Sequence, residues 1–387
     1  MQFIDLTAQQ KRIREKIDAN VSAVLEHGRY IMGPEVGDLE KSLGEFCGVK
    51  NAVSCASGTD ALLLALMAHN VGPGDAILTS PFTFVATAEV ISLLGATPVF
   101  VDIDPSTFNV DPEKIKPALS ALKAGDGSSH PLPNVSGLTA KGIIAVDLFG
   151  LPADYEKINA VAKENDLFVI EDAAQSFGAE YFGKKAGSLA DVACTSFFPA
   201  KPLGGYGDGG MCFTDDDNLA DVMRSLRIHG KGGHKYDNVR IGINGRLDTL
   251  QAAILQAKFD VFPEEVALRQ EVAGRYNELL SQGRSSEIAL QTPTTPSGYL
   301  SVWAQYSLLA KNEEQRSQIQ NQLKDAGIPT AVYYPLPLHL QTAFSGMGYR
   351  KGDFPVSEDF SKRIFSLPMH PYLNADEQQR IADVIYS

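Results

Sequence analysis

Short apolar runs alternate with helical stretches along residues 52–228, and this alternation limits the possible fold more than any other feature of the sequence. Runs such as 76–79 and 167–170 are typical of strands buried on both faces, whereas the stretch 154–165 has the length of a helix. Strands that alternate with helices usually lie parallel, since each helix carries the chain back to the edge where the previous strand began. The sequence therefore predicts a large α/β domain around a mostly parallel sheet.

A second, smaller domain is predicted after a long helix at 249–280, which Pro263 interrupts. Beyond this helix the pattern indicates two strands, at 304–309 and 330–333, and two helices, at 314–326 and 375–386. We place the boundary within the long helix, which gives a large domain of residues 1–260 and a small C-terminal α/β domain of residues 261–387.

Two other segments have a predicted place in the fold. Residues 1–30 contain a predicted helix at 9–27 and are expected to pack on the small domain. Residues 120–140 are polar, aperiodic and rich in glycine and proline, so we expect them to form a surface insertion.

The chain is acidic, with a formal net charge of −13 over 387 residues, which disfavours a protein that coats nucleic acid. The most apolar long window, 77–101, contains Glu89, Gly95 and prolines, so it is expected to be core and not a membrane span. The four cysteines form no C-x-x-C pair and have no ligand-like spacing to histidines, so buried thiols and no metal site are predicted. Because the N-terminus also lacks the features of a signal peptide, a cytoplasmic location is expected.

One lysine, Lys201, lies between two prolines at the start of a glycine-rich loop that follows an apolar run at 192–198. Pro199 and Pro202 restrict the backbone, while the glycines that follow allow a ligand to approach closely. An amine held in this way can bond covalently to a carbonyl, provided that burial or a neighbouring cation lowers its pKa. Pyridoxal phosphate (PLP) is the cofactor that such a lysine most often holds.

Two other interpretations of this stretch stay open. Gly205, Gly207 and Gly210 match the G-x-G-x-x-G pattern of dinucleotide sites, but residues 211–214 indicate a strand where that site needs a helix. A surface glycine loop with one solvated lysine also fits. The choice depends on whether the chain supplies a phosphate site and a partner for a cofactor ring.

Two segments could supply these parts. Ser57, Gly58 and Thr59 stand between a predicted strand and a predicted helix, where the helix N-terminus favours a bound phosphate, although a plain helix cap has the same residues. Asp172 follows the strand at 167–170, at the edge where ligands bind in open α/β sheets. A carboxylate there would keep the nitrogen of a PLP ring protonated, although helix capping or magnesium binding also explains an aspartate in this place.

Residues 227–242 form the densest basic stretch of this acidic chain, with Arg227, Lys231, Lys235 and Arg240 beside histidines and glycines. Such a stretch could bind a diphosphate through its positive charges. A solvated loop explains it as well, so both interpretations stay open.

Three of these segments, in this order and spacing, resemble the PLP-dependent nucleotide-sugar aminotransferases of the DegT/StrS family. They are Ser-Gly-Thr at 57–59, Glu-Asp-Ala-Ala-Gln at 171–175 and Thr-Ser-Phe-Phe-Pro-Ala-Lys at 195–201. The resemblance covers nearly the whole chain and extends to the segments 33–35, 82–87, 244–253 and 366–371. It implies PLP-dependent transferase fold type I, the aspartate-aminotransferase type, in which a large domain with a mixed, mostly parallel sheet precedes a small α/β domain.

The resemblance also implies a role for each residue at a matching position. Lys201 would bind the cofactor as a Schiff base, Asp172 would contact the pyridine nitrogen, and Gln175 would contact the ring hydroxyl. Phe84 would cover the ring, and Gly58, Thr59 and Ser196 would hold the phosphate. Asn244 would reach the phosphate of the other subunit, which implies a homodimer with shared active sites. Arg246, Tyr333 and Tyr334 would contact the sugar or its carboxylate.

Within the family, the segments 246–253 and 366–371 are most similar to enzymes that act on UDP-2-acetamido-2-deoxy-3-keto-glucuronate. This similarity implies transfer of the amino group of L-glutamate to the 3-keto group of a UDP-linked N-acetylated hexuronate, for surface polysaccharide such as lipopolysaccharide O-antigen. Tyr333 stands where those enzymes often carry a histidine. The alternatives are an aminotransferase for a dTDP-3- or 4-keto-6-deoxyhexose and a PLP-bound sensor or regulator without turnover.

Overall fold

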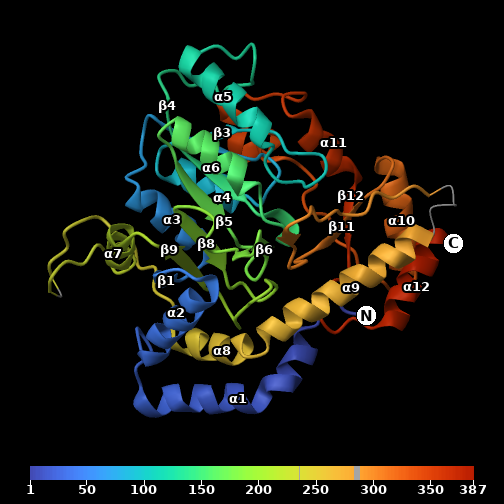
Figure 1. Ribbon diagram of the computed structural model, residues 1–387, viewed down its shortest axis with the longest axis horizontal. Helices are drawn as coiled ribbons and strands as arrows, with labels where there is room; N and C mark the ends of the chain where they lie inside the picture. Colours follow the sequence, from blue (N-terminus) through green and yellow to red (C-terminus); the bar gives the residue numbers. More distant parts are fainter. Residues whose placement is uncertain (235, 283–287) are drawn as a thin grey trace.

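The structure, a computed structural model, describes residues 1–234, 236–282 and 288–387, and a central sheet of seven strands organises it (Figure 1). The strands, in the order β1-β9-β8-β5-β4-β2-β3, are β1 (Asn51–Cys55), β9 (Gly210–Thr214), β8 (Val192–Ser196), β5 (Phe168–Asp172), β4 (Thr139–Val146), β2 (Asp75–Thr79) and β3 (Thr97–Phe100). All of them run in one direction except β9, which is antiparallel to β1 and β8. The mixed, mostly parallel sheet expected from the sequence is confirmed.

Helices cover both faces of this sheet. One face packs on α3 (Gly58–Ala68), α4 (Ala86–Leu93) and α7 (Asp217–Leu226), through fully buried side chains such as Leu64, Ile91 and Met223. The other face packs on α2 (Pro34–Cys47), α5 (Pro112–Ala124), α6 (Tyr155–Glu164) and α8 (Thr249–Phe259). Because the strands are apolar on both sides, each face needs a helical layer, and the result is a three-layer α/β/α arrangement.

The chain after α8 forms a second packed unit around α9 (Phe262–Gln282). Pro263 lies in the first turn of α9, where a helix needs no amide donor from that residue. The core of this unit joins α9 to α10 (Glu313–Asp325), α12 (Ala375–Tyr386) and the antiparallel strands β11 (Tyr306–Leu309) and β12 (Ile364–Leu367). The division of the chain into domains at residues 260 and 261 stays a prediction.

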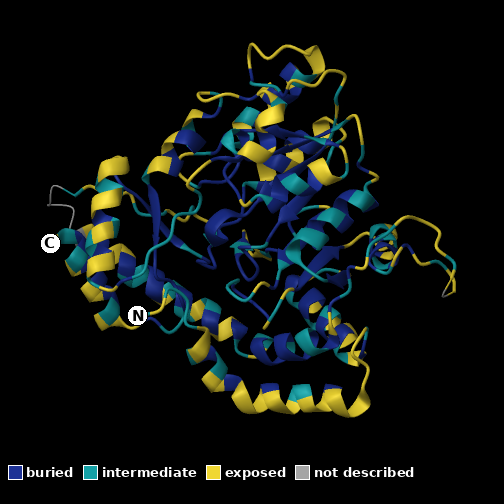
Figure 2. Ribbon diagram, turned by 180° about the vertical axis from the view of Figure 1, so that it is seen from behind, coloured by how far each residue is buried: buried dark blue, intermediate teal, exposed yellow. Residues whose placement is uncertain are grey.

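The N-terminal helix α1 (Leu6–His27) packs along α8, where Ile13 and Ile17 contact Ile254. Its other side is largely exposed (Figure 2). The residues that precede α1 approach the C-terminal unit: Met1 packs against its core, and the carbonyl of Phe3 accepts a hydrogen bond from the Met369 amide at 3.2 Å. Most of the N-terminal segment therefore lies against α8, and its first residues lie against the small unit.

Some elements differ from the expectations. Helix α5 continues to Ala124 and β4 begins at Thr139, so the irregular segment is shorter than 120–140. The strand expected at 330–333 is wrong, because that segment makes only an isolated bridge from Ala331 to Ser366 of β12, which pairs along its length with β11. Strand β12 and α11 (Pro355–Arg363) were not foreseen, nor was a small sheet of β10 (Tyr299–Leu300), β6 (Glu180–Tyr181) and β7 (Lys184–Lys185).

Two further properties follow from the described ranges. All four cysteines are buried and free, as expected. Within the same ranges, no helix combines the length and the apolar character that a membrane span requires.

Candidate active site

The carboxyl ends of β1, β4, β5 and β8 lie at one edge of the central sheet, because these strands share one direction. Gly58 follows β1, Asp147 follows β4, Asp172 ends β5, and Lys201 lies in the loop after β8. Ligands bind at this edge in open α/β sheets. The fold therefore brings together side chains that are more than a hundred residues apart in the sequence.

Asp172 is the most enclosed charged side chain of this edge that the sequence singled out, with 6% of its surface exposed. The hydroxyl of Thr87 donates to its Oδ2 at 2.9 Å, and the Ala174 amide donates to its Oδ1 at 3.2 Å. Burial raises the pKa of Asp172, while the Thr87 hydrogen bond and the charge of Lys201 oppose that rise. The carboxylate is therefore fixed in orientation and close enough to Lys201 to interact with its charge.

Lys201 lies on a loop that folds back on itself. Its amide donates to the Phe198 carbonyl at 2.9 Å, and the Gly205 amide donates to the Phe197 carbonyl at 2.7 Å. A Cβ atom at Gly204 would come within 2.5 Å of the Pro199 carbonyl oxygen, so the loop requires glycine there. Burial lowers the pKa of the Lys201 amine, which increases the fraction of neutral amine that can act as a nucleophile.

Helix α3 begins directly beside the end of β8. Ser57 caps the helix, since its side-chain oxygen accepts a hydrogen bond from the Asp60 amide at 3.0 Å. The first amides of a helix, here those of Gly58 and Thr59, have no partner within it. A Cβ atom at Gly58 would lie 2.6 Å from Cβ of Ser196, so glycine is needed for this close approach. Helix amides and the Ser196 hydroxyl thus converge on a cradle that suits a phosphate.

A hydrogen bond from the Phe149 amide fixes the side chain of Gln175 and the orientation of its amide group. Its Oε1 accepts a hydrogen bond from the Phe149 amide at 2.9 Å, so its Nε2, which carries two N–H donors, points to the other side. Nε2 donates to the Tyr334 hydroxyl at 3.3 Å, and burial raises the pKa of Tyr334. The side chain of Gln175 therefore presents a donor to the site, as the contact with a phenolic oxygen of a cofactor would need.

Two aromatic residues expected at the site differ in their surroundings. Phe84 exposes 55% of its surface, and its ring centroid lies 6.5 Å from that of Tyr334, so it is available to cover a planar ligand. Tyr333 is half-buried, and its ring lies 6.4 Å from that of Phe3 and 6.0 Å from that of Tyr334. The structure therefore groups Phe84, Tyr334 and Gln175, with Tyr333 against the N-terminal segment.

Asn244 and Arg246 lie on a segment that runs beside the start of α3, where the Gly245 carbonyl accepts a hydrogen bond from the Ala56 amide at 3.1 Å. Asn244 is exposed, and Arg246 is half-buried with its Nε enclosed and without a hydrogen-bond partner. Within the described part of the chain, no hydrogen bond joins either residue to Asp172 or Lys201. Within one chain, the side chains of Asn244 and Arg246 are therefore available to contact a ligand or a second copy of the protein.

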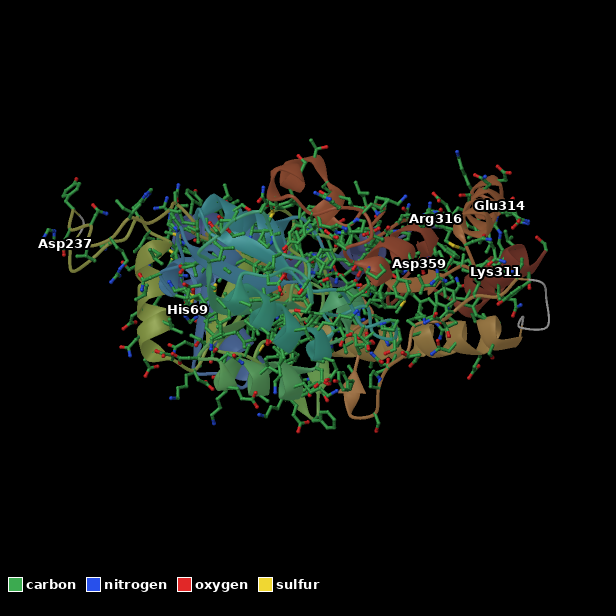
Figure 3. All side chains as sticks on the ribbon, turned by 90° about the horizontal axis from the view of Figure 1, so that it is seen from above. His69, Asp237, Lys311, Glu314, Arg316 and Asp359 are labelled. Atoms are coloured by element: carbon green, nitrogen blue, oxygen red, sulfur yellow. The ribbon has the colours of Figure 1, made fainter. Side chains whose placement is uncertain are left out.

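The basic stretch 227–242 is divided by the fold. Arg227 is 5% exposed, forms an ion pair with Glu40 and donates to the Ser54 carbonyl at 2.7 Å, so its proposed share in binding a diphosphate is wrong. The later part of the stretch projects from the body of the molecule, and Asp237 lies near its tip (Figure 3). Lys235, which was named with this stretch, lies outside the described residues.

Three polar residues of this edge were not assigned from the sequence. Thr83 and Thr87 are buried next to Asp172, and Asp147 is buried beside the same strand end. The rule that pointed to Asp172, a carboxylate at the end of a parallel strand, would also have found Asp147 at the end of β4. For the threonines the sequence gives only a weak signal, the i, i+4 spacing that places both side chains on one side of the start of a helix.

These residues fit PLP. A close-packed glycine cradle for a phosphate, a desolvated lysine, an oriented carboxylate and an outward amide donor lie around one edge of the sheet. Within the described ranges, no cluster of histidine, cysteine, aspartate and glutamate could hold a metal ion. The fold and this set of residues are those of PLP-dependent transferases of fold type I.

Comparisons with known proteins identify the group within this class. The model of the DegT/DnrJ/EryC1/StrS aminotransferase family matches residues 11–386, and the chain belongs to this family. It is 49% identical over 374 residues to the UDP-2-acetamido-2-deoxy-3-oxo-D-glucuronate aminotransferase of Pseudomonas aeruginosa, covering 97% of this chain and 96% of that protein.

Two solved structures support the same assignment. A DegT/DnrJ/EryC1/StrS aminotransferase from Brucella abortus superposes with a TM-score of 0.92 at 48% identity, over 100% of this chain and 98% of that one. NtdA from Bacillus subtilis, solved with the bound cofactor PMP, superposes with a TM-score of 0.85 at 28% identity, over 99% of this chain and 82% of that one. The chain is therefore a PLP-dependent transaminase.

Proposed function

We propose that this protein transfers the amino group of L-glutamate to the 3-keto group of a UDP-linked N-acetylated hexuronate, a step in the biosynthesis of surface polysaccharide. The observation that carries the proposal is the 49% identity, over 97% of the chain, to an enzyme named for a UDP-linked 3-oxo-glucuronate. The half-buried Arg246, whose Nε has no partner, supplies a guanidinium that could pair with a sugar carboxylate.

Each residue of the edge has a part in this chemistry. PLP, when bound, supplies a carbonyl for the amine and a ring that withdraws electrons from the reacting carbon. Lys201 Nζ would take a proton from the Cα of the amino donor and pass it to the cofactor carbon within the same half-reaction. In the half-reaction with the sugar ketone the same amine would move a proton in the reverse direction. Asp172 would stabilise positive charge at the ring nitrogen, and Gln175 would donate to the ring hydroxyl. Gly58, Thr59 and Ser196 would bind the phosphate, and Phe84 would cover the ring.

We also propose a homodimer with shared active sites. Asn244 is exposed, and two apolar residues of the same segment, Val239 and Ile241, expose 56% and 88% of their surfaces. Tyr30 and Ile31, which are also exposed, lie beside the segment that carries Arg246, since Ile31 bridges Asp248. A second copy that covers these apolar side chains would bring Asn244 and Arg246 to its partner's cofactor site.

Mixed dimers test this arrangement. A Lys201→Ala chain and an Arg246→Ala chain, each poorly active alone, should regain activity when combined. One of the two sites in each mixed dimer then has both residues intact, provided that each site draws Lys201 from one chain and Arg246 from the other. The measurement is the specific activity of mixed dimers purified with two different affinity tags. No recovery would show that both residues serve the site of their own chain.

Substrate preference tests the identity of the sugar. A UDP-linked 3-keto-hexuronate should be preferred over its neutral 6-deoxy analogue, because a buried carboxylate must be paired. Arg246→Ala should lower kcat/KM for the uronate roughly 30-fold, which corresponds to a loss of about 2 kcal/mol in transition-state binding. This value is the lower end for a truncated buried charge pair, because Arg246 is only half-buried. The neutral analogue should lose much less. Lys163→Ala, a change to an exposed lysine of α6, is the control for a general loss of positive charge.

The two alternatives are separated by the same assay. A wild-type preference for the dTDP-linked 6-deoxy sugar, or equal losses for both sugars in Arg246→Ala, would contradict the uronate assignment. A protein that binds PLP but releases no 2-oxoglutarate when mixed with L-glutamate and a panel of keto sugars would be the sensor without turnover.

A further inference from the structure

Two buried threonines lie next to Asp172: Thr83 in the segment that leads into α4, and Thr87 in the first turn of that helix. Thr83 is 2% exposed and Thr87 is 1% exposed, so neither hydroxyl is shared with solvent. Thr87 Oγ1 lies 2.9 Å from Oδ2 of Asp172, and Thr83 Oγ1 lies 3.1 Å from Thr87 Oγ1. The three side chains therefore form a chain of hydrogen bonds that ends on the carboxylate.

The chemistry of these groups fixes the direction of the chain. An ionised carboxylate can only accept hydrogen bonds, so the single hydroxyl proton of Thr87 must be donated to Asp172. Thr87 is then an acceptor toward Thr83, whose own proton completes the chain. A hydrogen bond to a charged group is stronger than one between neutral groups. Because both hydroxyls are buried away from water, the low local dielectric strengthens their hydrogen bonds further.

The surroundings of Asp172 make such a donor necessary. Asp147 and Glu171, both buried carboxyls, lie beside it, and burial is the main cause of the raised pKa of each, with about 7 for Asp147. Cys194 of β8, Tyr155 and Tyr334 also interact with the charge of Asp172, and Lys201 is the cation that faces it. Neighbouring carboxyls disfavour one another's ionisation. The negative charge is therefore most stable on the carboxyl that has hydrogen-bond donors and a cation around it, which is Asp172.

We propose that Thr87 is a positioning residue for the transamination site: its hydroxyl keeps Asp172 ionised and holds the carboxylate in the orientation that a protonated cofactor ring needs. Thr83 supports it by directing the hydroxyl of Thr87 toward Asp172. This inference rests on the proposed function, because it assumes that Asp172 contacts the ring nitrogen of PLP. Within the segment 82–87, Thr83 and Thr87 then have roles at the site in addition to Phe84.

Four variants separate positioning from packing. Thr87→Val removes the donor at nearly constant volume, and Thr87→Ser keeps the hydroxyl. Thr83→Val leaves the donor to Asp172 but removes the group that directs it. Thr79→Val is the matched control, because Thr79 is also fully buried but its Oγ1 donates to the Ile144 carbonyl, at 3.0 Å, and not to Asp172.

The first measurement is the dissociation constant of PLP, obtained by titrating the apoprotein. Loss of a hydrogen bond to a charged group should raise this constant in Thr87→Val by about 10- to 100-fold. Thr83→Val should raise it less, and Thr87→Ser and Thr79→Val should stay close to wild type. The second measurement is the visible absorption of the bound cofactor as a function of pH. Its midpoint should shift in Thr87→Val in the same direction as in Asp172→Asn, and it should not shift in Thr79→Val.

The outcomes distinguish this inference from the proposed function. If wild type binds PLP on Lys201 and Thr87→Val matches Thr79→Val in both measurements, the role of Thr87 is refuted and the function stands. If wild type takes up no PLP, the assignment of the site fails, and the inference fails with it. If Thr87→Val does not fold, Thr83→Val is the deciding variant. A cofactor affinity and a pH midpoint in Thr83→Val equal to those of Thr79→Val would also refute the chain of hydrogen bonds.

Discussion

Replacing Lys201 with alanine is expected to lower kcat by about 10²- to 10⁴-fold, because the reaction loses the amine that moves the proton between carbons. The amine is suited to this task in the folded chain, where burial lowers its pKa and Asp172 lies near enough to interact with it. The fold should not suffer, since the backbone of Lys201 keeps its hydrogen bond to the Phe198 carbonyl. Lys201→Ala should therefore still bind pyridoxamine phosphate, which needs no covalent link.

Chemical labelling makes this prediction specific to one lysine. Borohydride reduction of the yellow wild-type protein, followed by peptide mapping, should place the reduced cofactor on Lys201. Lys163→Ala, which alters an exposed lysine of α6, is the matched control and should keep both the label and the activity. A label on another lysine, or undiminished turnover in Lys201→Ala, would show that the assignment of the nucleophile is wrong.

Much of the fold could be predicted because its causes are local. The apolar strands and the helices between them are readable from spacing, and their alternation leads to a mostly parallel sheet. The strand order could not be read, because it depends on which apolar faces meet across long intervals. Strand β12 escaped notice for a related reason: four residues between a helix and a proline carry little pattern until they pair with β11.

The site shows the same division between local and distant causes. Lys201, Asp172 and Gln175 lie in short motifs that follow strands, so their place at the sheet edge could be inferred from the sequence. The contact of Thr87 with Asp172 spans 85 residues, and the ion pair of Arg227 with Glu40 spans 187 residues. No periodicity links such positions. For that reason Thr87 received no role, and neither interpretation of Arg227, diphosphate binding or a solvated loop, foresaw its buried ion pair with Glu40.

Asp172→Asn is the second change with a large expected effect. The amide keeps the size of the side chain, and its one oxygen can still accept the hydrogen bond from Thr87, while its NH2 group replaces the oxygen that accepts from the Ala174 amide. The loss of that one longer hydrogen bond should leave the fold intact. The amide cannot carry the negative charge that stabilises a protonated ring nitrogen. Breaking a buried charge pair on one side costs about 3–5 kcal/mol, which corresponds to a fall in kcat of roughly 150- to 5,000-fold.

The pH dependence of the rate tests the same charge in the wild-type protein. Burial raises the pKa of Asp172, so the carboxylate becomes protonated at a higher pH than an exposed aspartate does. Protonation removes the charge, and the rate should therefore fall as the pH decreases through that pKa. Asp172→Asn should lack this acidic limb and should be slow at every pH. Asp154→Asn, which changes the cap of α6 away from the site, is the control and should keep the wild-type profile.

The half-reaction with L-glutamate is the measurement that isolates this effect, because it requires the cofactor ring but no sugar. Stopped-flow absorption would give its rate for wild type and for Asp172→Asn. A folded Asp172→Asn protein with a near-wild-type rate would mean that Asp172 serves the structure alone and that another residue contacts the ring nitrogen. Since the hydroxyl of Thr87 donates to this carboxylate, a slow half-reaction in Asp172→Asn and a milder slowing in Thr87→Val would place both residues in one electrostatic unit behind the ring.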